Sequence, residues 1–298
     1  MADTSEYATD ALVSPDWLEE HLDEFGNDDP EYRLVEADIE YEESYAEGHI
    51  PNAIGFGWGT HLQDSTQRDI LKKDQFAEIM GDAGIMEDST VVLYGDEWNQ
   101  WAAYTYWQFK YYGHEDVHLL DGGRVYWEEN DYPMTTDEPG FPEREYDVSG
   151  PFDNIRIYRE GVEDALEVDV PLVDVRSAAE YRGEKIAPEG SRETAQRAGH
   201  IPDAQNITWS ENLEDTGRFK SRAELEDLYA DYGITGDSEI ITYCRIGERS
   251  SITWFTLHEL LGYEDVRNYD GSWTEWGNLI RSPVEVETDD PATLATEG

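Results

Sequence analysis

The strongest constraint on the fold of this chain is that its sequence repeats once. Four short motifs occur in the same order in both halves: 34–38 and 172–176, 48–53 and 199–204, 113–117 and 262–266, 121–123 and 270–272. The second copy carries 13 extra residues within 182–198, because its first two motifs start 27 residues apart instead of 14, and later motifs keep a constant offset of 149. A repeat in this order indicates an internal duplication, so we expect two domains of one type.

Each copy alternates strand and helix patterns, which predicts an α/β fold in which a mainly parallel sheet is flanked by helices. In the second copy we predict strands at 172–175 and 240–243, a helix that begins after the Ser221–Glu224 capping box, and a helix over 250–261 that ends at Gly262. In the first copy the corresponding segments are a strand over 91–94 and a helix over 101–112.

Turn-forming residues at 136–142 mark the border between the two copies. We expect an N-terminal domain over 1–138, a linker over 139–153, a C-terminal domain over 154–284 and an acidic tail over 285–298. The tail has no periodic apolar pattern, so we expect it to be loosely ordered.

The formal net charge of −48, from 69 acidic and 21 basic residues, is larger than solubility requires. Repulsion of this size would destabilise a compact state in dilute buffer. At about 1 M salt the screening length is about 3 Å, which removes most of it. We therefore expect a cytoplasmic protein of a halophile. The charge argues against nucleic acid and anionic membranes as partners, and no secretory signal or membrane span is predicted.

The single cysteine, Cys244, follows the predicted apolar strand and begins a six-residue polar loop that ends at Arg249. This order places the sulfur at the carboxyl end of a sheet, where open α/β folds bind ligands. Converging backbone N–H groups would lower the cysteine pKa well below about 8.5. Arg245 and Arg249 would offer forked donors to an oxyanion. Glu248 adds opposing charge, and we expect it to point outward or to pair with an arginine.

The first copy lacks these residues. At the offset of 149, Gly95 aligns with Cys244, Asp96 with Arg245, and Gln100 with Arg249. We therefore predict that the first copy is a catalytically inactive scaffold. With one cysteine, the chain also has no internal disulfide and no resolving thiol.

The loop, the two Gly-His-Ile-Pro turns and the segment 269–276 together resemble tandem-domain rhodaneses, which are thiosulfate sulfurtransferases. The resemblance implies two tandem rhodanese-like domains and a catalytic Cys244 that takes the sulfane sulfur of thiosulfate as a persulfide, releases sulfite, and passes the sulfur to cyanide or a thiol acceptor. It implies no cofactor and no metal. It assigns substrate binding to Arg245, Ile246, Gly247, Glu248, Arg249 and Ser250.

Three other functions are alternatives to a thiosulfate sulfurtransferase. A 3-mercaptopyruvate sulfurtransferase typically has a neutral loop with Gly and Ser or Thr after the cysteine, which this chain lacks. A phosphatase of related fold needs one residue more between the cysteine and the arginine. A non-catalytic persulfide carrier for a protein partner stays open, although the loop arginines favour an enzyme that binds a small dianion.

Further residues are candidates for supporting roles. Asp174 and Arg176 end a strand that we expect to border the loop, and the counterpart of Arg176 is Asp38. Glu180 stands where tandem sulfurtransferases often carry an arginine. His49 and His200, which occur in both copies, are predicted to stabilise turns. Four residues in or beside the insertion either line the cleft or form a solvated basic patch: Arg182, Lys185, Arg192 and Arg197.

Overall fold

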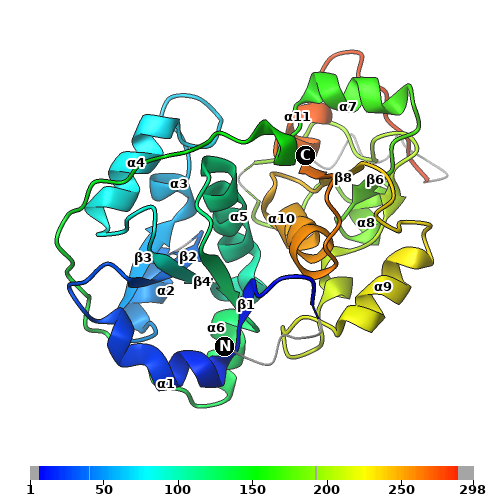
Figure 1. The fold of residues 1–298 in the computed structure, drawn as a ribbon. Coiled ribbons are helices and arrows are strands. Elements are labelled where there is room, and N and C mark those ends of the chain that lie inside the picture. The colour runs from blue at the N-terminus through cyan, green and yellow to red at the C-terminus, as the bar shows by residue number, and fades with distance from the viewer. Residues whose placement is uncertain (1–6, 40, 192, 288–298) are drawn as a thin grey trace. The chain divides into compact units, whose positions relative to one another are not determined.

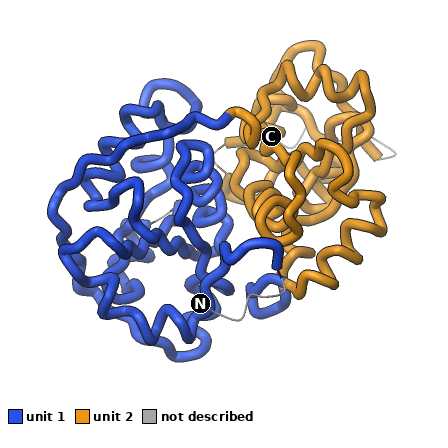
Figure 2. The backbone as a smooth tube through the Cα atoms, viewed as in Figure 1, with its two compact units in different colours: residues 1–152, 214–219 blue, residues 153–213, 220–298 orange. Residues whose placement is uncertain are grey.

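The structure, a computed structural model, describes residues 7–39, 41–191 and 193–287. The chain divides into two compact units (Figure 2). Unit 1 comprises residues 1–152 and 214–219, and unit 2 comprises residues 153–213 and 220–298. The predicted acidic tail lies outside the described residues from position 288 onward, as does Arg192.

Unit 1 is a five-stranded parallel sheet with helices packed around it (Figure 1). The strand order is β1-β5-β4-β2-β3. Its elements are β1 (Leu12–Val13), α1 (Pro15–Phe25), β2 (Tyr32–Asp38), α2 (Tyr41–Glu47), β3 (Ala53–Gly57), α3 (Trp58–His61), α4 (Lys73–Asp82), β4 (Thr90–Tyr94), α5 (Asp96–Tyr112), β5 (Val117–Leu120) and α6 (Gly123–Glu129).

Unit 2 repeats this architecture with four parallel strands in the order β7-β6-β8-β9. A parallel bridge between Arg156 and Asn268 extends the sheet beyond β9, as β1 does beyond β5 in unit 1. The elements are η1 (Asp153–Ile155), α7 (Arg159–Leu166), β6 (Leu172–Asp174), α8 (Ala178–Tyr181), β7 (Gln205–Asn206), η2 (Trp209–Asn212), α9 (Arg222–Ala230), β8 (Ile240–Tyr243), α10 (Glu248–Phe255), the π-helical η3 (Thr256–Leu260), β9 (Val266–Asn268) and α11 (Ser272–Trp276). The predicted α/β class is confirmed.

The local signals in the sequence match several of these elements. The strand predicted at 240–243 is β8, and the Ser221–Glu224 capping box begins α9. The helix predicted over 250–261 starts two residues earlier and changes to a π-helical turn after Phe255. In the first copy α5 begins at Asp96, before the predicted start at Trp101, and contains three left-handed residues.

The two copies also share details of their packing. The rings of His49 and His200 stack on Tyr45 and Tyr181 at 3.7 Å, and each ring bonds through Nδ1 to the carbonyl oxygen of the same tyrosine. The prediction that these histidines stabilise turns is therefore confirmed. Because both copies have them, neither distinguishes the copy that carries the cysteine.

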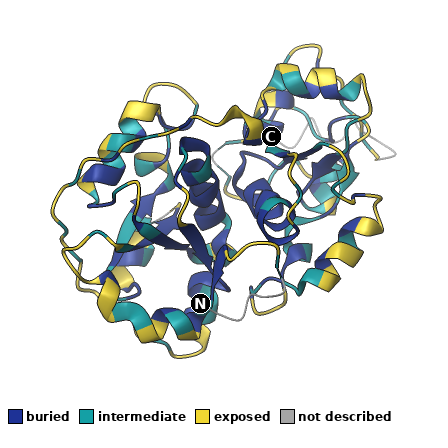
Figure 3. Ribbon diagram, in the orientation of Figure 1, coloured by how far each residue is buried: buried dark blue, intermediate teal, exposed yellow. Residues whose placement is uncertain are grey.

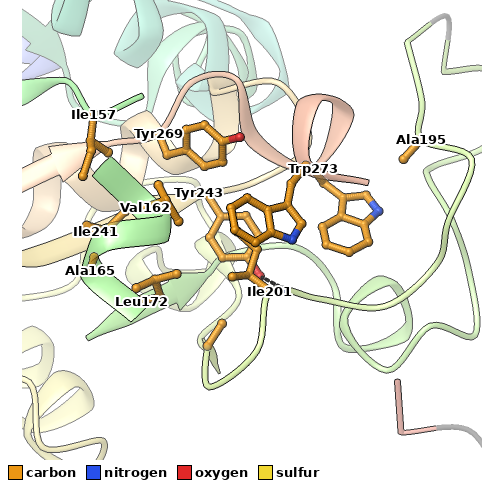
Figure 4. Packing of buried hydrophobic residues seen from close by; sticks show 12 residues of the cluster. Ile157, Val162, Ala165, Leu172, Ala195, Ile201, Ile241, Tyr243, Tyr269 and Trp273 are labelled. Carbon is orange, nitrogen blue, oxygen red and sulfur yellow. Dashed lines mark hydrogen bonds between the residues drawn. The ribbon is translucent and has the colours of Figure 1, made fainter. Parts of the chain in front are cut away.

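The core of unit 2 lies directly beneath the strand that carries the cysteine. Figure 4 shows Tyr243 of β8 between aliphatic side chains of the sheet and the ring of Trp273. Its hydroxyl oxygen accepts a hydrogen bond from the backbone N–H of Ile201 at 3.1 Å. In Figure 3, α10 is buried along its length, whereas α9 exposes one face. The loop between β8 and α10 thus starts from a rigid, buried strand and ends in a buried helix.

Candidate active site

Cys244 lies at the carboxyl end of β8, which β6 and β9 flank on either side. The chain then turns through Gly247, whose φ of 103° is a left-handed value that favours glycine. This turn directs the Gly247 N–H at the cysteine, and it donates a hydrogen bond to Sγ over 3.1 Å. The predicted strand, loop and helix order therefore does bring a backbone donor to the sulfur.

The start of the loop, at Cys244, is held by the first residues of α11. The Ser272 hydroxyl accepts a hydrogen bond from the Cys244 N–H at 3.1 Å, and the N–H of Trp273 donates to the Cys244 carbonyl oxygen at 3.1 Å. Ser250, in the first turn of α10, donates through Oγ to Asn268 Oδ1 at 2.7 Å. Ile246 is buried. The loop is thus fixed on several sides before any substrate arrives.

The sulfur is fully buried and rests as a thiol. Burial raises the pKa of Cys244 above its ordinary value, and the charge of Glu248 raises it further. Arg249 and a backbone hydrogen bond from Ser250 act in the opposite direction without reversing the shift. The expectation that the loop lowers this pKa was therefore wrong. Removal of solvent and an adjacent carboxylate outweigh the nest of N–H groups.

Glu248 lies inside the loop and not at the surface, since its side chain is 3% exposed. Its Oε1 lies 3.4 Å from Arg245 Nη2 and 3.5 Å from Arg249 Nε. The alternative that it points outward was wrong, and the alternative that it pairs with an arginine is confirmed. Its Oε2 accepts a hydrogen bond from Cys244 Sγ at 3.1 Å, a contact that the sequence did not predict.

The two arginines are also engaged by other parts of unit 2. Arg245 donates from Nη1 to the carbonyl oxygen of Glu193, in the insertion, at 2.7 Å. Arg249 donates from Nη1 and Nη2 to the two carboxylate oxygens of Glu180 at 3.0 and 3.2 Å. Two buried glutamates thus accompany two buried arginines around the sulfur. The arginines are oriented by these contacts, and their charge is balanced.

The contact of Glu180 with the loop was not predicted from the sequence. Burial acts to raise its pKa, but Arg249 and Ser177 lower it below the ordinary value, so it carries a negative charge beside the loop. A signal for its position was present: Ser177 and Glu180 form a capping box that fixes α8 at the end of β6. At this position the glutamate pairs with Arg249.

Asp174 and Arg176 form a buried pair that supports the strand before the loop. Arg176 donates from Nε to Asp174 Oδ1 at 3.0 Å, and its guanidinium lies 4.5 Å from the centre of the Trp273 ring. The Tyr243 hydroxyl donates to Asp174 Oδ2 at 2.8 Å. These residues therefore position the end of β8, one residue before Cys244, and the structure gives neither of them a contact with the sulfur.

The first copy has the same buried carboxylate but takes its cation from elsewhere. Glu36 accepts hydrogen bonds from Tyr94, the counterpart of Tyr243, and from Arg124 Nη1 at 2.5 Å. Arg124 aligns with Trp273 and not with Arg176. The cation that pairs with the buried carboxylate therefore lies on α6 in unit 1 and just after β6 in unit 2. The difference between Arg176 and Asp38 at matching positions is therefore a difference in how the two cores pair their buried carboxylates.

The insertion's basic residues that the structure describes, Arg182, Lys185 and Arg197, do not gather at the loop. Arg182 pairs with Glu184 at 2.7 Å, with 40% of its side chain exposed, and Lys185 is exposed. Arg197 donates to four backbone carbonyl groups, those of Trp276, Gly277, Leu279 and Ser282. It therefore fixes the segment after α11.

In unit 1 the equivalent loop contains acids. The N–H of Asp96 donates to Asp38 Oδ1 at 2.7 Å, and Asn99 Oδ1 accepts a hydrogen bond from the N–H of Gly95 at 3.0 Å. Burial and the charge of Asp38 raise the pKa of Asp96 to about 9. Carboxyl groups thus occupy the positions of Arg245 and Arg176, and this loop has no guanidinium group to offer an anion at either position.

The half-buried Asp96 should make the stability of unit 1 depend on pH. A raised carboxyl pKa contributes stability that is complete below the ordinary value of 3.8 and is lost as the pH rises through about 9. We expect the melting temperature to fall between about pH 6 and about pH 9.5 at constant salt, and Asp96→Asn to flatten part of this fall. Thermal unfolding followed by circular dichroism checks this, with Glu129→Gln, an exposed carboxylate at the end of α6, as control. Equal slopes for Asp96→Asn and the parent would contradict it.

Within 7–39, 41–191 and 193–287, no group of three or more His, Cys, Asp or Glu side chains could hold a metal ion. Across the same described residues, no helix combines the length and apolar character needed to cross a membrane.

Known proteins resemble this chain over nearly its whole length. Residues 14–130 and 154–279 each match the family described as Rhodanese-like domain. A protein of the halophilic Haloferax volcanii named "Putative thiosulfate sulfurtransferase" is 63% identical over 281 residues, 94% of this chain and 98% of the relative. The "Sulfur carrier protein TtuD" of Thermus thermophilus is 48% identical, covering 92% of this chain and 96% of the relative.

Solved structures give the same picture of the fold. A variant of EanB in complex with ergothioneine superimposes with a TM-score of 0.79 at 25% identity, covering 94% of this chain and 71% of the other. The Tum1 protein of Saccharomyces cerevisiae superimposes with a TM-score of 0.76 at 23% identity, covering 93% of this chain and 98% of the other. At that identity the second comparison bears on the fold alone.

Proposed function

Since this chain belongs to the rhodanese family of sulfurtransferases, we propose that it moves the sulfane sulfur of thiosulfate through a persulfide on Cys244 to cyanide or a small thiol. Sγ bonds to the sulfane sulfur, the S–S bond of thiosulfate breaks, and sulfite leaves with the bonding electron pair. The acceptor then attacks the outer sulfur and restores the cysteine. The chain needs no second thiol for this cycle.

The observation that carries the proposal is the setting of Cys244. One thiol lies at the carboxyl end of a central strand, with a backbone N–H directed at the sulfur and two guanidinium groups in the same loop. Forked guanidinium donors suit the oxygens of a departing sulfite. The first unit carries acids at the matching positions, and we propose that it is catalytically inactive and serves as a scaffold.

A sulfur carrier for a protein partner is the second candidate, and the likeness to TtuD supports it. The burial of Cys244 favours the enzyme, because a fully buried sulfur is accessible to a small donor or acceptor with less rearrangement than to a protein. A 3-mercaptopyruvate donor is the third candidate. The charged loop favours thiosulfate over this monoanion.

The proposal predicts that thiosulfate adds one sulfur atom to the protein. Intact-protein mass spectrometry should show this adduct on the parent, its removal by reductant or cyanide, and one sulfite released for each sulfur bound. Cys244→Ser, which keeps a small polar side chain, is the matched control and should show neither. Absence of an adduct on the parent would refute both the enzyme and a carrier loaded by thiosulfate.

The same assay separates the candidates by donor and acceptor. Faster steady-state turnover with thiosulfate than with mercaptopyruvate, and parallel double-reciprocal lines with cyanide, would support the proposed ping-pong enzyme. A stable adduct that small acceptors do not discharge would favour the carrier.

A further inference from the structure

The two carboxylate oxygens of Glu248 face different partners. Oε1 is directed at the guanidinium groups of Arg245 and Arg249, at 3.4 and 3.5 Å. Oε2 faces the sulfur of Cys244, whose thiol donates to it over 3.1 Å. The side chain lies one turn after the cysteine, at the first residue of α10, and is almost fully buried. One oxygen is therefore held by cations and the other is available to a proton.

The reaction requires such a proton acceptor. The nucleophile in persulfide formation is the thiolate, whereas burial and the neighbouring carboxylate keep Cys244 as a thiol. Because Sγ has no exposed surface, its proton cannot pass directly to bulk water in this conformation. The hydrogen bond from Sγ to Oε2 already marks a path for the proton.

We propose that Glu248 is the general base and general acid of the sulfur-loading step, a role that rests on the proposed function. Its carboxylate takes the proton of the Cys244 thiol as Sγ bonds to the sulfane sulfur of thiosulfate. The S–S bond of thiosulfate breaks and its electron pair leaves with sulfite. Glu248 then gives the proton to an oxygen of that sulfite. The thiol and the thiosulfate dianion thus become a persulfide anion and hydrogen sulfite, and atoms and charge balance.

The surrounding charges couple this proton transfer to anion binding. The charged groups that face Glu248 are Arg245 and Arg249, and Glu180 of α8 faces it through Arg249. While Glu248 is ionised, its Oε1 attracts both guanidinium groups. Once it holds the proton, this attraction weakens, and the arginines are free to bind the departing sulfite. Negative charge therefore leaves the carboxylate at the step in which it develops on the leaving group.

Glu248→Gln tests this role with two measurements that should change in opposite directions. Glutamine keeps the shape but removes the negative charge, so the thiolate becomes easier to form and alkylation of Cys244 by iodoacetamide at neutral pH should become faster. Single-turnover sulfur loading from thiosulfate should become slower, by roughly 100-fold or more, because the base is lost. If the glutamate only repels anions or orients the arginines, removal of its charge accelerates loading or leaves it unchanged. Either result would overturn the proposal.

Two controls keep the test decisive. Glu180→Gln removes the other buried carboxylate on Arg249 without a contact to the sulfur, and it should leave the alkylation rate of Cys244 near that of the parent. If Glu248→Gln does not fold, loading by the parent in D₂O decides: a slower rate supports proton transfer in the step, and an unchanged rate refutes it. A parent that takes up no sulfur refutes the proposed function itself, while the alkylation rates still report on the contact between Glu248 and Cys244.

Discussion

Replacing Arg249 by methionine is expected to lower the free energy of unfolding by about 3–5 kcal/mol and to abolish sulfur loading. The guanidinium holds Glu180 through two hydrogen bonds and also faces Glu248. All three side chains are buried, so the substitution leaves Glu180 without its cation, and Glu248 with Arg245 alone, in a medium that solvates charge poorly. Methionine has a similar length and is apolar, so the loss of charge dominates over the loss of packing. Urea unfolding in high salt measures the change.

The double variant Arg249→Met with Glu180→Gln separates the structural role of the arginine from its chemical role. Removing both members of the pair should restore part of the stability, because the buried carboxylate of Glu180 no longer lacks a partner. Sulfur loading should remain absent, because the donor to the substrate oxygens is still missing. A single Arg249→Met variant as stable as the parent would show that the pair is already solvated, and recovery of loading in the double variant would show that Arg249 does not contact substrate.

The arrangement of the fold could be predicted because it depends on local sequence patterns that occur in both copies of the repeat. Strand β8 is a buried run of four β-branched or aromatic residues, and the helix after it ends near Gly262, whose φ is 77°. The capping box at Ser221 marked the start of α9 to the residue. The π-helical turn at 256–260 could not be predicted in this way, because apolar spacing does not distinguish it from the helix that precedes it.

The loop could be predicted as a unit, but its electrostatics could not. Position in the sequence places Cys244 beside Arg245 and Arg249, and the first copy supplies a comparison without them. Glu180 is 69 positions from Arg249 and meets it only through the parallel pairing of β6 with β8. The direction in which the pKa of Cys244 shifts depends on the burial of the sulfur and on the rotamer of Glu248. Neither can be predicted from the order of residues.

Unfolding at low salt is the second large effect that we expect, and α1 shows why. Five acidic side chains of this helix, Asp16, Glu19, Glu20, Asp23 and Glu24, are exposed, and the helix contains no lysine or arginine. Glu20 lies one turn from both Asp16 and Glu24, and like charges at this spacing destabilise a helix. Asp23 and Glu24 also lie at the negative end of the helix dipole. With a net charge of −48, such repulsion extends over the chain.

The protein should therefore be folded and active in molar KCl or NaCl and lose both properties at about 0.01 M salt, where the screening length grows to about 30 Å. Glu20→Lys is the matched test, because it turns two repulsive pairs on α1 into attractive ones of about 0.2–0.5 kcal/mol each. This variant should raise the melting temperature at low salt and have little effect in molar salt, since screening removes attraction and repulsion alike. Hydrogen exchange should show α1 opening first as salt is removed. A parent that stays folded and fully active at low salt would contradict this account, because the buried apolar core alone would then outweigh the unscreened repulsion.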